Sequence, residues 1–118
     1  MPTIVVVDTK KDIVLLKKTL HDYNVVAFDN GKEALDALPS LKPDLVILEM
    51  LMPGMPGKEI CEQIRKNPAT KTLKVMFVTI AKLSDTGKTV LQKLGVVDYV
   101  TKPFDKTDLL HRVEKALE

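Results

Sequence analysis

Apolar residues are distributed along the chain in two different patterns. Five short apolar runs, rich in valine and isoleucine, are separated by longer stretches in which apolar residues recur every three or four positions. Continuous apolar runs, unlike alternating ones, are typical of strands that are covered on both faces in a parallel sheet. The runs are Ile4–Val7, Val25–Phe28, Leu45–Leu48, Val75–Val78 and Val96–Val100, the last with Asp98 inside it.

The longer stretches have the spacing of amphipathic helices, as Ile13, Leu16 and Leu20 illustrate by lying on one helical face. A glycine in the left-handed conformation often ends a helix, and Gly95 can end the fourth one. Side-chain oxygens that can cap the amino termini of four helices are supplied by Thr9, Asn30, Ser84 and Asp105.

The order of elements is therefore strand then helix, repeated five times. Parallel strands need crossover connections, which are right-handed, so helices are expected on both faces of one sheet. The pattern predicts an α/β fold, a doubly wound five-stranded parallel sheet with five helices. The chain has 118 residues, the usual size of one domain, so we expect a single domain over residues 1–118.

Composition narrows the setting in which this domain works. Eighteen basic and sixteen acidic residues give a net charge of +2, too low to indicate direct nucleic-acid binding. Cys61 is the only cysteine and has no intrachain partner, which fits a reducing compartment. The first ten residues lack the features of a signal peptide, and no apolar run reaches the roughly 18 residues that span a membrane. We expect a cytoplasmic protein without membrane contact.

Candidate chemistry lies at the carboxyl ends of the strands, where doubly wound sheets bind their ligands. Asp8 follows the first strand, Glu49 the third and Thr79 the fourth, and Lys102 comes directly after the fifth. One edge of the sheet should therefore carry two carboxylates, a hydroxyl and an ammonium group. That combination suits Mg²⁺, which prefers oxygen ligands, and a phosphoryl group.

The same positions carry a resemblance to a known family. The stretches that match are IVVVD, PDLVILE followed by MPGMPG, MFVTIA and VDYVTKPF, and the likeness extends over all 118 residues. In these motifs the chain resembles the receiver domain of two-component response regulators. The resemblance implies the flavodoxin-like receiver fold and a cis peptide bond between Lys102 and Pro103. Such domains take part in phosphorelay signal transduction.

The resemblance also implies roles for individual residues. Glu49 stands at the phosphoacceptor position, Thr79 and Lys102 match the residues that bind phosphoryl oxygens, and Tyr99 matches the switch aromatic. Asp8 matches an acidic metal ligand, and Asp8 with Glu49 would hold Mg²⁺. Tyr99 could equally be ordinary strand packing.

Two departures from the family pattern affect the chemistry. Thr9, which can serve as a helix cap, stands where the family has a second acid, and Glu49 stands where it has aspartate. A third, smaller departure is Pro56, where an aspartate is common. Glutamate moves the nucleophile by about 1 Å, and a misplacement of that size can slow a reaction about a hundredfold. With one acidic ligand fewer, Mg²⁺ binding should be weak or lost.

These departures leave two interpretations open. The chain can be a stand-alone, atypical receiver that is phosphorylated weakly or not at all and signals by protein contact. Alternatively, it is a constitutive pseudo-receiver, an interaction module in which Glu49 reaches Lys102 and imitates the phosphorylated aspartate or replaces the metal. In both interpretations the protein is not an enzyme, and at most it accepts a phosphoryl group in a phosphorelay.

Other classes of α/β protein fit less well. A dehalogenase-type phosphatase needs an acid where Lys10 stands, and no glycine-rich phosphate loop of a dinucleotide or nucleotide protein is present. The expected partner is a sensor histidine kinase or a downstream signalling protein. A homodimer is also predicted as an option, through the face of the fourth helix, fifth strand and fifth helix. Basic residues in that region are Lys82, Lys88, Lys93, Lys106, Arg112 and Lys115.

Overall fold

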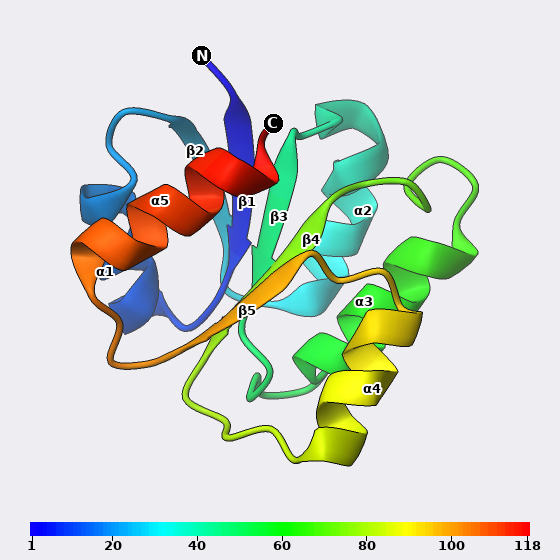
Figure 1. Cartoon of the computed structure of the whole chain (residues 1–118). Coiled ribbons are helices and arrows are strands. Elements are labelled where there is room, and N and C mark those ends of the chain that lie inside the picture. Colours follow the sequence, from blue (N-terminus) through cyan, green and yellow to red (C-terminus); the bar gives the residue numbers. More distant parts are fainter.

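A computed structural model describes all residues from 1 to 118. Its centre is one parallel sheet with the strand order β2-β1-β3-β4-β5 (Figure 1). The chain first adds β2 on one side of β1 and then β3, β4 and β5 on the other, so the direction of winding reverses at β1. The strands are β1 (Thr3–Val7), β2 (Asn24–Phe28), β3 (Leu45–Leu48), β4 (Val75–Thr79) and β5 (Asp98–Thr101).

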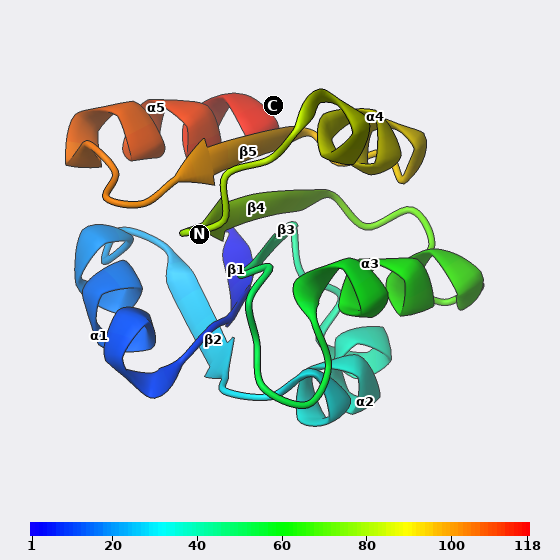
Figure 2. The same ribbon diagram turned by 90° about the horizontal axis from the view of Figure 1, so that it is seen from below.

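Five helices cover the two faces of this sheet. Helices α1 and α5 lie on one face, and α2, α3 and α4 lie on the other (Figure 2). This is the doubly wound fold predicted from the sequence, which is therefore confirmed. The helices are α1 (Lys10–Thr19), α2 (Gly31–Leu41), α3 (Gly57–Lys66), α4 (Asp85–Lys93) and α5 (Lys106–Ala116).

The predicted caps are confirmed at three of four helices. Asn30, Ser84 and Asp105 each accept a hydrogen bond from the backbone N–H three residues later. Thr9 holds the N-cap position of α1, but its side chain makes no capping hydrogen bond. The side chain of Asp8 instead accepts the N–H of Thr9 at 2.7 Å, so the capping role predicted for the Thr9 side chain is wrong.

The fifth strand begins later than its apolar run suggested. Val96 donates its N–H back to the carbonyl of Leu91, so it belongs to the end of α4 and not to β5. Gly95, with φ of 70°, makes this turn, as the sequence predicted. The strand itself starts at Asp98 and runs to Thr101, directly before Lys102.

The apolar residues of the strands form two separate cores, one on each face of the sheet. Alternate residues of β1 contribute to both, because Val5 and Val7 face α2 and α3 while Ile4 and Val6 face α1 and α5. The central strands β1, β3 and β4 are almost completely buried, whereas β2 at one edge is mostly half-exposed. None of the helices is long and apolar enough to cross a membrane.

Candidate functional site

Four side chains predicted from the sequence meet at the carboxyl edge of the sheet. Asp8 directly follows β1 and Glu49 directly follows β3, on neighbouring strands at the point where the winding reverses. Thr79 is the last residue of β4, and Lys102 directly follows β5. Parallel pairing brings these four strand ends together, so residues up to 94 positions apart in the chain come into contact.

Lys102 lies at the centre of the cluster and contacts three carboxylates. Its Nζ atom donates to Asp8 Oδ2 at 2.7 Å, to Asp12 Oδ2 at 2.8 Å and to Glu49 Oε1 at 3.1 Å. An ammonium group has three N–H donors, so each one has a carboxylate partner. The cis peptide bond between Lys102 and Pro103, expected from the family resemblance, is present directly after this residue.

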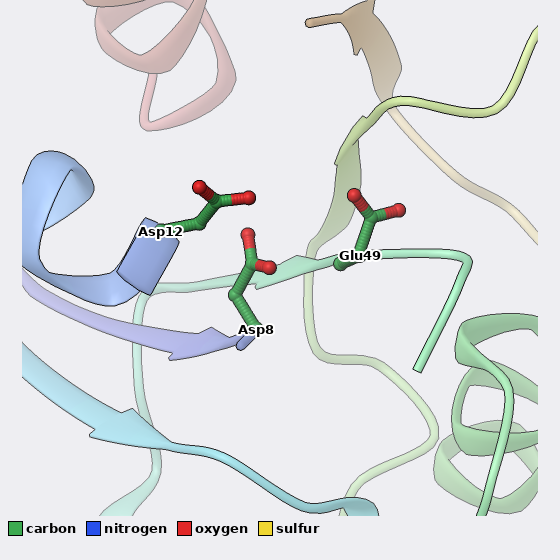
Figure 3. A group of neighbouring side chains, drawn as sticks. All are labelled: Asp8, Asp12 and Glu49. Carbon is green, nitrogen blue, oxygen red and sulfur yellow. The ribbon is translucent and has the colours of Figure 1, made fainter. Parts of the chain in front are cut away.

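Asp12 is the member of the cluster that the sequence reasoning missed. It lies in the first turn of α1, four residues after Asp8, and its side chain turns back toward the strand end (Figure 3). The signal available in the sequence was its position in the first turn of the helix that begins two residues after Asp8. The expectation that only two carboxylates remain at this site is therefore wrong, because the site has three.

The Glu49 carboxylate accepts four hydrogen bonds. Its Oε1 atom accepts from the Ile80 N–H and from Lys102, both at 3.1 Å, and Oε2 accepts from the Leu51 N–H at 3.1 Å and from the Thr79 hydroxyl. The side chain is 3% exposed. A carboxylate has about four lone-pair positions, so Glu49 is fully satisfied without any further ligand.

The two strand-end acids respond to burial in opposite ways. Burial raises the pKa of Asp8 above its usual value, more than its hydrogen bonds from Lys102 and Thr9 lower it. Burial also acts to raise the pKa of Glu49, but the donors Thr79, Leu51, Ile80 and Lys102 together hold that pKa below its usual value. Glu49 is therefore the firmly ionised acid of the pair.

The lysine is held in its charged form. Burial acts to lower the pKa of Lys102, but the contacts with Asp12, Asp8 and Glu49 outweigh it and raise that pKa. One ammonium faces three carboxylates, so the cluster keeps an excess of negative charge when all groups are ionised. A second cation would be attracted to it.

The carboxylates of Asp8, Asp12 and Glu49 fit a divalent cation. All three project above the ends of β1 and β3 (Figure 3), and one oxygen of each lies within 4.8 Å of the other two. Carboxylate oxygens are ligands that Mg²⁺ prefers, so this group could hold it. The Lys102 ammonium lies among the same oxygens, so an entering ion has to compete with it.

The loop that follows Glu49 is packed closely against it. Gly57, the first residue of α3, donates its N–H to the Met50 carbonyl at 2.8 Å. A Cβ atom at Gly57 would overlap the carbonyl oxygen of Glu49, so only glycine fits there. The start of α3 thereby fixes the backbone on which Glu49 and Leu51 lie.

A hollow of about 520 Å³ gives access to one side of the cluster. It lies between α1 and the segment after β5, with Asp12 and Lys102 among its lining residues. Leu15 and Ile80, which also line it, are 51% and 57% exposed. The charged cluster is thus buried but borders an open, partly apolar surface.

Tyr99 lies outside the cluster. It pairs in register with Phe77, whereas Thr79 pairs with Thr101. The Tyr99 ring is half-buried against the core under α4, and Lys88 Nζ of that helix lies 5.5 Å from the ring centroid. The ring therefore links β5 to α4.

The sequence matches the response regulator receiver domain family over residues 4–114. A response regulator from Chloroflexus aurantiacus J-10-fl is 32% identical, with a TM-score of 0.86, over 98% of this chain and 97% of that chain. Chemotaxis protein CheY4 of Vibrio cholerae is 25% identical, with a TM-score of 0.89, over 98% of each chain.

A third solved structure is similar in fold. It is the receiver domain of sensor histidine kinase PA1611 from Pseudomonas aeruginosa PAO1, with a magnesium ion coordinated in its active site cleft. It is 19% identical, with a TM-score of 0.86, over 98% of this chain and 97% of that chain.

Proposed function

The chain belongs to the response regulator receiver domain family of two-component signalling, and from that premise we propose that it is an atypical receiver. It signals by protein contact, and Glu49 is phosphorylated weakly or not at all. The partner is a sensor histidine kinase or a downstream signalling protein. The cytoplasmic location expected from the sequence stays a prediction.

The observation that carries this proposal is the hydrogen bonding of Glu49. Both of its oxygens already accept two donors, and the side chain is 3% exposed. To attack phosphorus, an oxygen has to give up at least one donor and take a position in line with the leaving group. The additional methylene of glutamate displaces that oxygen by about 1 Å, which can lower a rate about a hundredfold.

Magnesium would enter this proposal through Asp8, Asp12 and Glu49. Bound there, the ion would neutralise charge on a phosphoryl group. Asp12 supports the fit, because it supplies a carboxylate one helical turn beyond Thr9, the position that lacks an acid. We therefore propose that Asp12 takes part in cation binding in place of an acid at Thr9.

The test is direct labelling of the protein. Wild type incubated with Mg²⁺ and a small acyl phosphate should show little or no gain of about 80 Da, the mass of a phosphoryl group, by mass spectrometry. The double variant E49D/T9D should be labelled, and T9D/E49Q, which has no nucleophile at this position, should not. Rapid labelling of wild type at Glu49 would overturn the proposal.

A second candidate function rests on the identity of the donors around Glu49. Thr79 and Lys102 match the residues that bind phosphoryl oxygens in the family, and here both contact the glutamate. In this alternative Glu49 imitates the phosphorylated aspartate, and the domain is a constitutive interaction module. NMR spectra separate the two candidate functions. If Glu49 imitates the phosphorylated aspartate, the wild-type signals of Tyr99 and α4 resemble those of phosphorylated E49D/T9D and not those of the unphosphorylated variant.

The proposed contact surface is the face built by α4, β5 and α5, and a homodimer through it stays an option. Arg112 on this face pairs with Asp98 at 2.9 Å and with Asp108 at 3.0 Å, so part of its positive charge is already balanced. Sedimentation of wild type and Arg112→Ala over a range of concentrations tests the dimer, which should weaken in the variant.

A further inference from the structure

A second hollow lies at the amino ends of the strands, next to the starts of β4 and β5. It has a volume of about 520 Å³, and its lining residues come from the end of α3, the α3–β4 connection, the end of α4 and the residues just before β5. No acidic residue lines it. Its four basic lining residues are Arg65, Lys71, Lys74 and Lys93.

Two of these cations are fixed by backbone carbonyls. Arg65 donates to the carbonyls of Leu94 and Leu73, both at 2.6 Å, and to those of two further residues. Lys74 donates to the backbone oxygens of Ala116, the last residue of α5, and of Glu118, two residues later, both at 2.9 Å. A guanidinium has five N–H donors and an ammonium three, so each group keeps one N–H for a ligand.

The other two cations are free. Lys71 and Lys93 are exposed, and neither forms an ion pair with a carboxylate. Arg65 and Lys93 lie in the last turns of α3 and α4, where positive charge is favourable. Stabilisation of a helix end does not explain the positive charge of Lys71, because this residue lies in the connection before β4. The hollow thus combines two anchored positive charges with two exposed, unpaired ones, and no acidic residue lines it.

The lining also offers an apolar contact but no stacking surface. Val97 is 48% exposed in the hollow, beside the half-buried side chains of Leu73 and Leu94. No aromatic residue lines the hollow, so a nucleobase would find nothing on which to stack. Charge complementarity with an apolar centre favours a protein segment over a nucleic acid.

We propose that this hollow, lined by Arg65, Lys71, Lys74 and Lys93, binds an acidic segment of a partner protein that places one apolar side chain on Val97. This surface goes beyond the proposed receiver function. It lies at the strand starts, whereas Glu49 lies at the strand ends, so the two sites are separate.

The experiment uses the full chain and a short fluorescein-labelled peptide in which aspartate and glutamate flank a single leucine. Fluorescence anisotropy at low salt should show saturable binding that weakens as salt is added, because exposed charge pairs are screened. The double variant K71Q/K93Q should bind about tenfold more weakly, since it loses two exposed charge pairs with the peptide. Val97→Ser should weaken binding of the leucine peptide but not that of a peptide with serine in its place.

The matched control is K32Q/K58Q. Lys32 and Lys58 are exposed and form no ion pairs. They lie at the starts of α2 and α3, near the carboxyl ends of the strands. This variant has the same net charge as K71Q/K93Q and should bind like wild type. Equal weakening in both variants, or no binding by wild type, would overturn the proposal. Tighter binding of oligouridine RNA than of the peptide, also lost in K71Q/K93Q, would overturn the acidic protein as the ligand class.

Discussion

Glu49 is a buried acid whose ionised form the fold stabilises. An acid whose pKa is lowered on folding adds stability above its ordinary pKa, here 4.5, and that stability is lost as the pH falls through the folded value. Asp8 has the opposite sign, because its raised pKa means that ionisation opposes folding. The two acids therefore partly cancel in the overall pH dependence, so single variants are needed to separate them.

Thr79→Val isolates the contribution of Glu49. Loss of the hydroxyl donor should raise the pKa of Glu49 and lower the free energy of unfolding near neutral pH by about 1–3 kcal/mol, the cost of leaving a buried polar group without its partner. The loss should shrink in acid, where Glu49 is protonated in both proteins. Urea unfolding across this pH range measures it. Thr79→Ser keeps the donor, and equal stabilities of the valine and serine variants would contradict the argument.

Lys102→Met tests the cation competition directly. Removal of the ammonium leaves three carboxylates without a counter-ion and should cost about 3 kcal/mol at neutral pH. Mg²⁺ should recover much of this loss, and it should raise the melting temperature of the variant more than that of wild type, where Lys102 has to be displaced. Lys106→Met, at an exposed lysine without an ion pair, should behave like wild type. Equal effects of Mg²⁺ on wild type and Lys102→Met would contradict this competition.

The residues of the site were predictable to different degrees. Asp8, Glu49, Thr79 and Lys102 follow strand ends, so the fold alone brings them together. Asp12 was not predicted, because its contact depends on how the first turn of α1 is oriented over the strand. The contact between Glu49 and Lys102 was anticipated from side-chain length, but the two backbone donors to Glu49 depend on loop conformations that apolar patterns do not specify.

Among the elements, the β3–α3 loop has the most demanding geometry. Gly57→Ala would place a methyl group into the Glu49 carbonyl and within 2.9 Å of Met50 Cα, so backbone has to move. We expect a loss of more than about 2 kcal/mol in stability and a shift of the Glu49 signals in NMR spectra. Thermal unfolding and a carbon-detected NMR titration measure these effects.

Gly87→Ala is the matched control for that variant. The nearest atom to a Cβ at Gly87 lies at 3.5 Å, an ordinary contact, and the residue is helical. Alanine should therefore stabilise α4 by about 0.5–1 kcal/mol. Effects of the same sign at the two glycines would show that close approach to Glu49 is not the cause.

The apolar pattern predicts the bounds of some strands well and those of others poorly. The strands β1, β3 and β4 were predicted to within one residue, because their apolar runs end abruptly at polar residues. The start of β5 was misplaced because the apolar run begins at Val96, two residues before the strand. Val96 closes the turn after α4 through a backbone hydrogen bond, which apolarity does not reveal.

At the scale of the whole molecule, the sheet separates two cores that share the central strands. Amides of β1, β3 and β4 should exchange with solvent only on global unfolding, whereas those of β2, at a half-exposed edge, should exchange at least about tenfold faster through local opening. Hydrogen exchange followed by NMR measures this, after correction for intrinsic rates. Uniform protection across all five strands would indicate a single cooperative unit instead.

The whole-molecule topology was the most predictable level. Fivefold alternation of strand and helix, with right-handed crossovers, leaves few arrangements for a chain of 118 residues. The cationic hollow at the strand starts was not predictable in the same way. Its four basic residues come from α3, from α4 and from the connection before β4, and no short motif unites them.

The packing of Lys88 over Tyr99 has a practical consequence for spectroscopy. The protein contains no tryptophan and two tyrosines, so its ultraviolet emission comes from Tyr23 and Tyr99 alone. In a Tyr23→Phe background the remaining fluorophore is the ring in contact with α4. Displacement of that helix by a partner or an ion would then change the intrinsic emission, so an unlabelled sample could report it in a stopped-flow instrument.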